Sequence, residues 1–268
     1  MAYEVNAGGF AGSIVESRFS RVQREHAVLL GILCRDPTSV EIELLARAGY
    51  HAVWMDLEHS AISISDAAMW CRAIARVGMI PVIRIPEITR HTIQCALEAG
   101  YEIVVVPHIE TEDEARELVR LARYPPTGDR SVSSTQSRTG FTLGGSLAET
   151  LRLADESAHL MVQIESERGL QHLDAILSVP GIDMITVGPL DWSVSLGLYG
   201  PDAQAAMSER VEAVLKGAAA AGKTTGMLVR TVEEARLYRD LGVRILFLGV
   251  DVAVKREAFT ATISRFAE

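Results

Sequence analysis

Two stretches of this sequence decide its fold: MVQIE at residues 161–165 and MITVGPLD at residues 184–191. Each begins as a continuous apolar run of strand length, and the two end in a carboxylate, Glu165 in the first and Asp191 in the second. Continuous apolar runs are typical of strands that are buried on both faces of a parallel sheet. The two stretches, with a helix expected between them, therefore predict one strand–helix–strand unit of such a sheet.

Glu165 and Asp191 stand in matching positions, just past the carboxyl ends of two consecutive predicted strands. Two hard oxygen ligands that face one point suit Mg²⁺ or Mn²⁺, with waters or substrate in the remaining positions. The alternative is that each acid only caps the helix that follows it. The pair alone does not decide between a metal site and two helix caps, so the rest of the chain has to decide.

The same strand–helix pattern repeats along the whole chain. Several helical segments end in Ala-Gly or Leu-Gly, a signal for a helix C-terminus, at Gly49, Gly100, Gly222 and Gly242. Eight apolar runs are predicted as strands, at residues 28–33, 52–56, 80–85, 103–106, 161–165, 184–187, 225–229 and 245–248. Eight such units in about 250 residues predict a (β/α)₈ TIM barrel. A doubly wound open sheet is the alternative, but no Gly-x-Gly-x-x-Gly follows the first strand to support dinucleotide binding.

The barrel is expected to be a single domain spanning residues 1–268. Residues 1–25 are expected to form an N-terminal arm or a short helix across one end. Residues 131–146 are rich in Ser, Thr and Gly without periodicity, which predicts an irregular segment. Later helices are expected from Ser208 and from Val254 onward.

Composition limits the class of protein. The chain has 268 residues, 48% of them hydrophobic, and a formal net charge of −9, which argues against a nucleic-acid or anionic-membrane surface. Its three cysteines show no paired or metal-type spacing, which fits a reducing cytosol. No apolar run approaches the roughly 18 residues of a membrane span. We expect a cytoplasmic protein without membrane or nucleic-acid partners.

Polar and titratable side chains collect where the predicted strands end, and catalytic groups of a barrel enzyme are expected there. In chain order these are Cys34, Asp56, Glu58, His59, Arg84, His108, Gln163, Glu165, Asp191, Arg230 and Asp251. Cys34 is interpreted as core or pocket lining and Asp251 as structural. His108 is interpreted as a buried histidine with satisfied hydrogen bonds, with a further ligand or a pocket wall as the alternatives.

His59 is the candidate for proton transfer, because the pKa of an unperturbed imidazole lies near neutrality. Asp56 and Glu58 are close enough in sequence for one of them to orient the ring. Arg84 lies within an apolar run, so its guanidinium needs an anionic partner. That partner is either an acid of a neighbouring strand or an anionic reaction intermediate.

The positions of the lysines argue against a Schiff-base mechanism. The chain has only Lys216, Lys223 and Lys255, and none stands at a predicted strand end, so a Schiff-base mechanism has no obvious nucleophile. The carboxylate pair favours metal-assisted chemistry instead. A divalent ion held there could bind a 2-oxo acid and stabilise the enolate formed when a carbon–carbon bond breaks, and Arg84 could add positive charge at the same oxygen.

These residues resemble a known family, the HpcH/HpaI class II pyruvate aldolases, which include 4-hydroxy-2-oxoheptanedioate and 2-keto-3-deoxy sugar-acid aldolases. The resemblance runs from about Val28 to the last helix. Its motifs are DLEH at 56–59, PVIR at 81–84, RYPPTGDR at 123–130, QIE at 163–165, GPLD at 188–191 and GVD at 249–251.

The resemblance implies a role for each matching residue. Glu165 and Asp191 would hold a divalent ion, Mg²⁺ or Mn²⁺, with Co²⁺ or Zn²⁺ as further candidates. His59, supported by Asp56, would serve the acid–base step through water, and Arg84 would stabilise the pyruvate enolate. Gln163 would contact the oxo acid, and the backbone near Pro189 and Leu190 would bind its carboxylate. A homo-oligomer, commonly a hexamer, is also implied, with the last helix exchanged between neighbours.

The chain also departs from the family pattern. Leu190 stands where a small residue is usual, Trp192 where leucine is usual, and Ser131 where glycine is usual. His108 replaces a residue that is commonly apolar. The metal and base residues are retained, while the sequence does not specify the aldehyde.

The function expected from this combination is a metal-dependent lyase that reversibly cleaves a 4-hydroxy-2-oxo acid to pyruvate, or a related 2-oxo acid, and an aldehyde. Within enzymes, the alternatives are a citrate-lyase-β-like or malyl-CoA-type lyase and a metal-dependent hydrolase. A hydrolase would normally bring more histidine ligands. A non-catalytic barrel that binds a ligand is the alternative from a different class.

Overall fold

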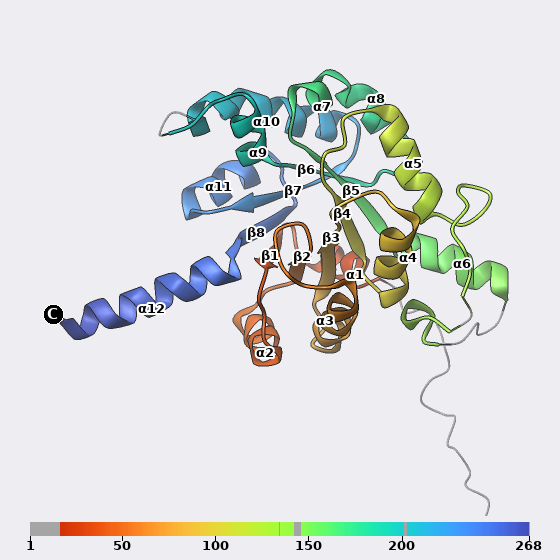
Figure 1. The fold of residues 1–268 in the computed structure, drawn as a ribbon, viewed down its shortest axis with the longest axis horizontal. Helices are drawn as coiled ribbons and strands as arrows, with labels where there is room; N and C mark the ends of the chain where they lie inside the picture. Colours follow the sequence, from red (N-terminus) through yellow and green to blue (C-terminus); the bar gives the residue numbers. More distant parts are fainter. Residues whose placement is uncertain (1–16, 134, 142–145, 201–202, 268) are drawn as a thin grey trace, which may run out of the picture.

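The computed structural model describes residues 17–133, 135–141, 146–200 and 203–267. Within these ranges the strands are β1 Leu29–Cys34, β2 Ala52–Asp56, β3 Ile80–Arg84, β4 Ile103–Val106, β5 His159–Ile164, β6 Met184–Val187, β7 Thr224–Val229 and β8 Ile245–Val250. Neighbouring strands pair in parallel in chain order, and β8 pairs with β1 to close the barrel. The predicted (β/α)₈ TIM barrel is confirmed (Figure 1).

Helices alternate with these strands. Their bounds are α1 Arg18–Glu25, α2 Ser39–Ala48, α3 Ile64–Arg76, α4 Arg90–Ala99, α5 Glu112–Ala122, α6 Leu147–Glu156, α7 Glu167–Gln171, α8 Leu173–Ser178, α9 Pro189–Ser195, α10 Ala203–Ala220, α11 Val232–Asp240 and α12 Asp251–Ala267. A short 3₁₀ helix, η1 Ser137–Thr139, lies in the segment predicted to be irregular. Helix α10 begins five residues before the expected Ser208, and α12 begins three residues before the expected Val254.

Local sequence explains where several helices begin and end. Thr38 and Glu41 form a capping box at the start of α2, since each side chain accepts a hydrogen bond from the other residue's backbone N–H. At the far end of α2, Gly49 has a φ of 95°, a left-handed conformation that glycine adopts without a steric penalty.

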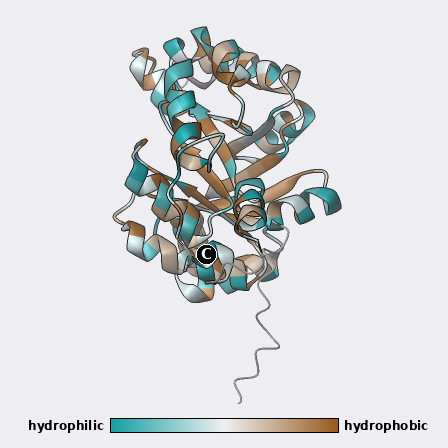
Figure 2. Ribbon diagram, turned by 90° about the vertical axis from the view of Figure 1, so that its right-hand side faces the viewer, coloured by the Kyte–Doolittle hydropathy of each residue, from teal (hydrophilic) through white to brown (hydrophobic). Residues whose placement is uncertain are grey.

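The barrel has two layers of packing. Alternate residues of each strand point to the interior of the barrel, where they form one hydrophobic cluster. The other residues face the surrounding helices and form a second, larger cluster. Figure 2 shows mostly hydrophobic strands at the centre, surrounded by helices that contain both hydrophilic and hydrophobic residues. Gly31 is required in β1, because a Cβ atom there would lie 2.5 Å from the Phe247 ring inside the barrel.

Helix α1 closes the amino end of the barrel. Phe19 and Val22 are buried against the interior cluster. Glu102, just before β4, accepts hydrogen bonds from the Phe19 backbone N–H at 2.9 Å and from Arg18 Nη1 at 2.8 Å. The helix lies in the segment expected to form an arm or a helix, and residues 1–16 of that segment lie outside the described residues.

Helix α12 does not pack along its own barrel. It starts directly after β8, leaves between α11 and α2, and extends away from the remainder of the chain (Figure 1). Large apolar side chains on it are exposed, among them Phe259, Ile263 and Phe266. Among the described residues, no helix is long and apolar enough to cross a membrane.

Candidate active site

The residues proposed from sequence as catalytic, substrate-binding or metal-binding lie at one end of the barrel. Asp56 and Arg84 are the last residues of β2 and β3, and Glu165 directly follows β5. Asp191 lies in the first turn of α9, four residues after β6 ends. Because all strands run in the same direction, their carboxyl ends open on one face, where barrel enzymes carry their active sites.

Asp56 and Arg84 form a buried ion pair with two parallel hydrogen bonds. Arg84 Nε lies 2.9 Å from Asp56 Oδ1, and Arg84 Nη2 lies 2.8 Å from Asp56 Oδ2. The two residues are 0% and 6% exposed. Paired strands bring them together, since Asp56 and Arg84 are neighbours in the β2–β3 register. A bidentate arrangement fixes the plane of the guanidinium as well as its position.

Arg35, just after β1, adds a second cation to the same acid. Its Nε donates to Asp56 Oδ2 at 3.1 Å. Burial alone raises the pKa of Asp56, but hydrogen bonds and charge from Arg84 and Arg35 outweigh burial and leave that pKa below its ordinary value. Asp56 is therefore an anion that serves to hold two arginines.

Glu58 connects Arg84 to both histidines of this face. One oxygen, Oε2, lies 2.8 Å from Arg84 Nη1 and 3.7 Å from His59 Nε2. The other oxygen, Oε1, lies 3.4 Å from His108 Nε2. Asp56 reaches His59 only through the His59 backbone N–H, at 3.4 Å. Of the two acids that could orient the imidazole of His59, the one that faces the ring is Glu58.

Glu165 is a buried carboxylate with few partners. Gln163 Nε2 donates to Oε2 at 2.6 Å, and the His108 backbone N–H donates to Oε1 at 2.8 Å. Burial raises the pKa of Glu165 above its ordinary value, against the opposing effect of these hydrogen bonds. Gly188 leaves room for the carboxylate, since a Cβ atom at that position would lie 2.2 Å from Glu165 Oε2.

The interpretation of His108 as a buried histidine with satisfied hydrogen bonds was wrong. Its side chain is 62% exposed, with Nδ1 at 3.1 Å from Glu165 Oε1. Its φ of 55° lies in the left-handed region, which few residues other than glycine adopt. The turn after β4 therefore points the imidazole out over the face of the barrel.

The GPLD motif forms the start of α9. Pro189 is the first residue of this helix, where a missing N–H costs nothing. Leu190 is exposed, whereas Trp192 is fully buried and donates from Nε1 to Glu167 Oε1 at 3.1 Å. Asp191 is half-buried, and its carboxylate makes no hydrogen bond or ion pair with the described residues.

These carboxylates suit a hard divalent ion. Glu165 has no lysine or arginine partner among the described residues, and its contacts are with Gln163 and with the backbone and ring of His108. Asp191 follows the neighbouring strand, β6, which pairs with β5 through Ile164 and Val187. A buried carboxylate and an unpaired half-buried one, which follow neighbouring strands, offer the oxygen donors that Mg²⁺ or Mn²⁺ prefers.

Comparison with known proteins shows the family to which the chain belongs. The family model described as HpcH/HpaI aldolase/citrate lyase matches residues 35–258. The chain belongs to this family. It is 34% identical over 248 residues to the hydroxypyruvate/pyruvate aldolase of Delftia acidovorans, a match that covers 92% of this chain and 91% of that protein.

Two further HpcH/HpaI relatives cover nearly the whole chain. The 2-keto-3-deoxy-L-rhamnonate aldolase of Salmonella gallinarum is 31% identical over 254 residues, covering 95% of this chain and 94% of that protein. A crystal structure of a family protein from Burkholderia cenocepacia superposes with a TM-score of 0.82 at 31% identity, covering 93% and 99% of the two chains. This HpcH/HpaI protein is accordingly a carbon–carbon lyase.

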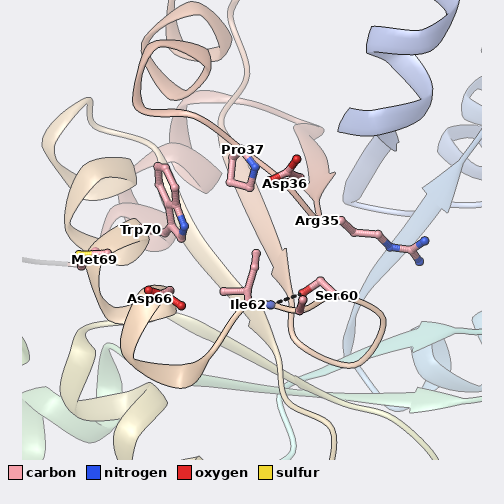
Figure 3. A pocket seen from close by; sticks show the side chains of 9 residues that line it. Arg35, Asp36, Pro37, Ser60, Ile62, Asp66, Met69 and Trp70 are labelled. Carbon is pink, nitrogen blue, oxygen red and sulfur yellow. Dashed lines mark hydrogen bonds between the residues drawn. The ribbon is translucent and has the colours of Figure 1, made fainter.

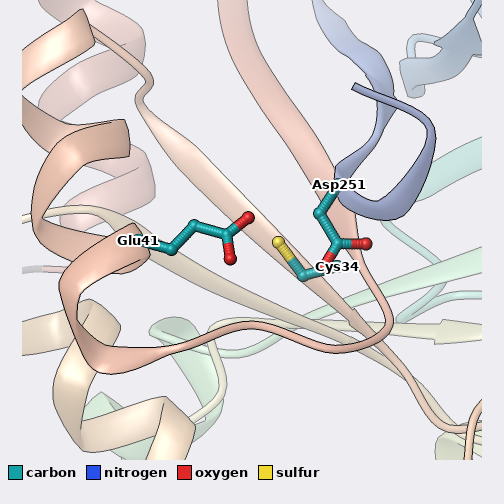
Figure 4. Close-up of side chains that lie close together, drawn as sticks. All are labelled: Cys34, Glu41 and Asp251. Atoms are coloured by element: carbon teal, nitrogen blue, oxygen red, sulfur yellow. The ribbon is translucent and has the colours of Figure 1, made fainter. Parts of the chain in front are cut away.

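A second acidic cluster in this HpcH/HpaI barrel lies between β1 and α12 and consists of Cys34, Glu41 and Asp251 (Figure 4). Lys255 bridges its two carboxylates, with Nζ at 2.7 Å from Glu41 Oε2 and 3.1 Å from Asp251 Oδ2. Asp251 also accepts hydrogen bonds from the backbone of Arg35 and Asp36. Burial raises the pKa of the Cys34 thiol well above its ordinary value. The cluster fastens the start of α12, which confirms the structural interpretation of Asp251.

A cavity of about 500 Å³ lies beside the candidate active site, between the loops that follow β1 and β2. Arg35, Pro37, Ser60, Ile62 and Trp70 are among the residues that line it (Figure 3). Arg35 belongs to both places, since it lines this cavity and donates to Asp56. The cavity and the site are therefore neighbours on the same face.

Sequence reasoning gave Arg35 no role and Glu58 only a minor one. Arg35 follows the predicted strand end at Cys34 by one residue, so its position was the available signal. Arg230, which does follow a strand end, is exposed, and its backbone N–H donates to Glu234 of α11. Position after a strand is thus a useful guide, but it does not tell which side chains turn inward.

Proposed function

We propose that this chain is a metal-dependent class II aldolase that reversibly cleaves a 4-hydroxy-2-oxo acid to pyruvate and an aldehyde. The observation that carries the proposal is the pairing of two features at the carboxyl end of the barrel. One is the buried Glu165 without a lysine or arginine partner, and the other is the Arg84 guanidinium held rigid by Asp56 and Glu58. The names of the two aldolase relatives support it.

Glu165 and Asp191 would hold the ion, Mg²⁺ or Mn²⁺, with Co²⁺ or Zn²⁺ as alternatives. When bound, the ion supplies Lewis-acid stabilisation of negative charge on the oxygen of the 2-oxo group. No lysine lies among the strand-end residues described here, and Lys255 is engaged by Glu41 and Asp251. The chain thus offers carboxylates for the reaction rather than an amine nucleophile.

Arg84 would bind the same oxygen as charge develops on it. Its guanidinium is fixed before substrate arrives, through two hydrogen bonds to Asp56 and an ion pair with Glu58. A charged donor that needs no reorganisation stabilises a developing anion most effectively. Gln163 would contact the oxo acid beside it, and the backbone N–H groups near Leu190, at the start of α9, would receive its carboxylate.

His59 would move the proton, directly or through one water. Its ring is 43% exposed and lies on the same face, with Glu58 3.7 Å away. In cleavage, it accepts the proton of the C4 hydroxyl as the C3–C4 bond breaks. The electron pair of that bond passes to the C2 oxygen and gives the enolate of pyruvate, which Arg84 stabilises. Protonation of C3 then yields pyruvate, and the C4 fragment leaves as the aldehyde.

The test of this function is solvent deuterium exchange into the methyl group of pyruvate, followed by NMR. The protein would be stripped with chelator and assayed with and without Mg²⁺ or Mn²⁺. Exchange needs only enolate formation, so it requires no knowledge of the aldehyde. We expect exchange with metal and none without it. No exchange with any divalent metal would overturn the proposal.

The same assay separates the proposed aldolase from the alternative functions. A citrate-lyase-β-like or malyl-CoA-type lyase would act on a CoA thioester and would leave free pyruvate unexchanged, and a non-catalytic barrel would exchange nothing.

The three cysteines are free in the structure, which supports a reducing compartment, and we place the enzyme in the cytoplasm.

We propose that the enzyme is a homo-oligomer, commonly a hexamer in this family, in which α12 of one copy packs on the next. The helix exposes Phe259 at 70%, Ile263 at 70% and Phe266 at 92%. On either side of the point where it leaves the barrel, α2 exposes Val40 and Leu44, and α11 exposes Val232 and Leu237. Two exposed apolar surfaces of this kind bury each other when copies associate.

Light scattering after size-exclusion chromatography tests the oligomer. The unmodified chain is expected to have the mass of several copies, and the double variant Phe259→Asp with Ile263→Asp is expected to be smaller. Leu147→Asp on α6 is the matched control, since Leu147 is also exposed but lies elsewhere. A monomeric unmodified chain, or a double variant of unchanged mass, would contradict the role of α12.

A further inference from the structure

The side chains at the carboxyl end of the barrel fall into two tiers by exposure. Asp56, Arg84, Gln163 and Glu165 are buried and form the lower tier. His59, His108 and Leu190 are exposed and form the upper tier. In an aldolase the 2-oxo acid occupies the lower tier with its charged ligands. The second reactant, the aldehyde, then meets the side chains of the upper tier.

We infer that His108 is a specificity-determining residue whose imidazole hydrogen-bonds a hydroxyl group next to the carbonyl of the acceptor aldehyde. The inference rests on the proposed aldolase function and adds to it the class of acceptor, a neutral hydroxylated aldehyde.

The first argument is how His108 is held. Its backbone adopts a left-handed φ of 55°, and its N–H donates to Glu165 Oε1 at 2.8 Å. The main chain therefore positions the ring, and the ring itself contributes little to the fold, since its side chain is 62% exposed. A strained backbone conformation that presents an exposed polar group above a site is a feature of functional positions.

The second argument is the chemistry of the two ring nitrogens. Nδ1 lies 3.1 Å from Glu165 Oε1, and Nε2 lies 3.4 Å from Glu58 Oε1. At 3.4 Å the contact of Nε2 with Glu58 is longer than an ordinary hydrogen bond, so this nitrogen can bind a substrate group instead. A hydroxyl group both donates and accepts, and it therefore fits between an imidazole nitrogen and a carboxylate oxygen.

The third argument concerns the acceptors that this arrangement rejects. A carboxylated aldehyde would bring a negative charge against Glu58, whose Oε1 lies beside the ring. An alkyl aldehyde would leave the imidazole without its substrate partner. A site that is built to hydrogen-bond a hydroxyl discriminates against the analogue that lacks it.

The experiment compares glycolaldehyde with propanal, a pair of similar size in which a hydroxyl replaces a methyl group. Aldol addition of pyruvate to each is measured with Mn²⁺ for the unmodified enzyme and for His108→Gly. Glycine adopts the left-handed conformation without strain, so the backbone N–H to Glu165 is kept while the ring is lost. His108→Asn is a second variant, since asparagine also tolerates this conformation but is too short to replace the ring.

We expect the unmodified enzyme to prefer glycolaldehyde in kcat/KM, and both variants to lose about five- to tenfold of that preference, as for one neutral hydrogen bond. Added imidazole is expected to restore part of it in His108→Gly. Exchange of the pyruvate methyl protons is measured for each protein, so that a loss of aldehyde preference is separated from a loss of enolate formation. His26→Asn at the opposite end of the barrel is the control and should leave the preference unchanged.

An unchanged preference in both variants would overturn the inference. An equal loss for both aldehydes, together with reduced pyruvate exchange, would also overturn it and make His108 a positioning residue for Glu165. Failure of the unmodified enzyme to exchange pyruvate protons with any metal would instead remove the proposed function, and this inference with it.

Discussion

The two ends of the barrel each contain a buried acid paired with an arginine, and they differ in what the pair holds. At the amino end, Glu102 is 3% exposed and binds Arg18 and the backbone of Phe19, so it fastens α1 over the opening. At the carboxyl end, Asp56 is 0% exposed and binds Arg84 and Arg35. A buried acid–arginine pair is thus no sign of a catalytic site by itself.

The difference lies in the guanidinium. Arg18 is part of an amphipathic helix, and its side chain is 35% exposed at the surface. The Arg84 side chain is 7% exposed and keeps one nitrogen, Nη1, turned toward Glu58 and the candidate active site. The amino end uses its ion pair to close the barrel, whereas the carboxyl end uses its ion pair to hold a charged donor in place.

The largest expected effect separates these two arginines. Arg84→Lys should lower turnover at least about a hundredfold, about 3 kcal/mol of activation free energy, because a lysine cannot keep two hydrogen bonds to Asp56 and the contact with Glu58 together. Arg18→Lys should stay within about twofold of the unmodified enzyme. Steady-state kinetics of both variants measures the contrast, and equal losses would remove the distinction between the two ends.

Stability should show the opposite contrast. Phe19→Ala is expected to lower the free energy of unfolding by about 3 kcal/mol, because it removes a buried aromatic ring from the amino end of the core. Leu190→Ala, which truncates an exposed side chain at the carboxyl end, is expected to change stability by less than about 0.5 kcal/mol. Urea denaturation measures the free energy of unfolding of both variants. A small loss in Phe19→Ala would argue against a stabilising role of α1 at the amino end.

A glycine at each end gives a sharper comparison. Gly188→Ala would force a methyl group against Glu165 Oε2, so turnover is expected to fall about tenfold or more, at least about 1.4 kcal/mol, with little loss of stability. Gly242 has a φ of 90° and open space around its Cβ position. Gly242→Ala should therefore lose about 1 kcal/mol of stability and keep its turnover. Kinetics and denaturation of the two variants test whether Gly188 serves the site.

The last contrast concerns pH at the amino end. Burial lowers the pKa of His159 to about 4, and its ring packs edge-on against Phe19 at 4.7 Å. As the pH falls from about 6.5 toward 4, the unfolded chain takes up a proton that the folded chain refuses, so stability falls over this window and levels off below it. We expect about 2 kcal/mol of this loss from His159.

His159→Leu should lose that part of the pH dependence. Urea denaturation of both proteins at pH 7 and pH 4.5 measures it as a difference, which removes the contribution of the other titrating groups. Parallel pH profiles of the two proteins would show that His159 is not the group responsible.

Much of the fold followed from the sequence because it depends on periodicity. The eight apolar runs became the eight strands, and the residues after them gathered at one face, as a parallel barrel requires. The MVQIE and GPLD stretches thus placed Glu165 and Asp191 just past the ends of two adjacent strands. These features need only the order of apolar and polar residues, which a single sequence contains.

Side-chain pairing and loop conformation could not be read in the same way. Glu58 faces Arg84, His59 and His108 together, a geometry set by the turns after β2 and β4 rather than by spacing. The exposure of His108 depends on one left-handed residue that nothing in its neighbours signals. The departure of α12 from its own barrel likewise depends on what packs against it, which the pattern of α12 alone does not show.

The measurement that tests the central claim most directly is metal-dependent deuterium exchange into pyruvate by three proteins: the unmodified chain, Glu165→Gln and Glu102→Gln. Each variant neutralises one buried acid, the first at the carboxyl end and the second at the amino end. We predict exchange with Mn²⁺ in the unmodified chain and in Glu102→Gln, and none above background in Glu165→Gln. Full exchange in Glu165→Gln, or its loss in a folded Glu102→Gln, would contradict the assignment of the chemistry to the carboxyl end.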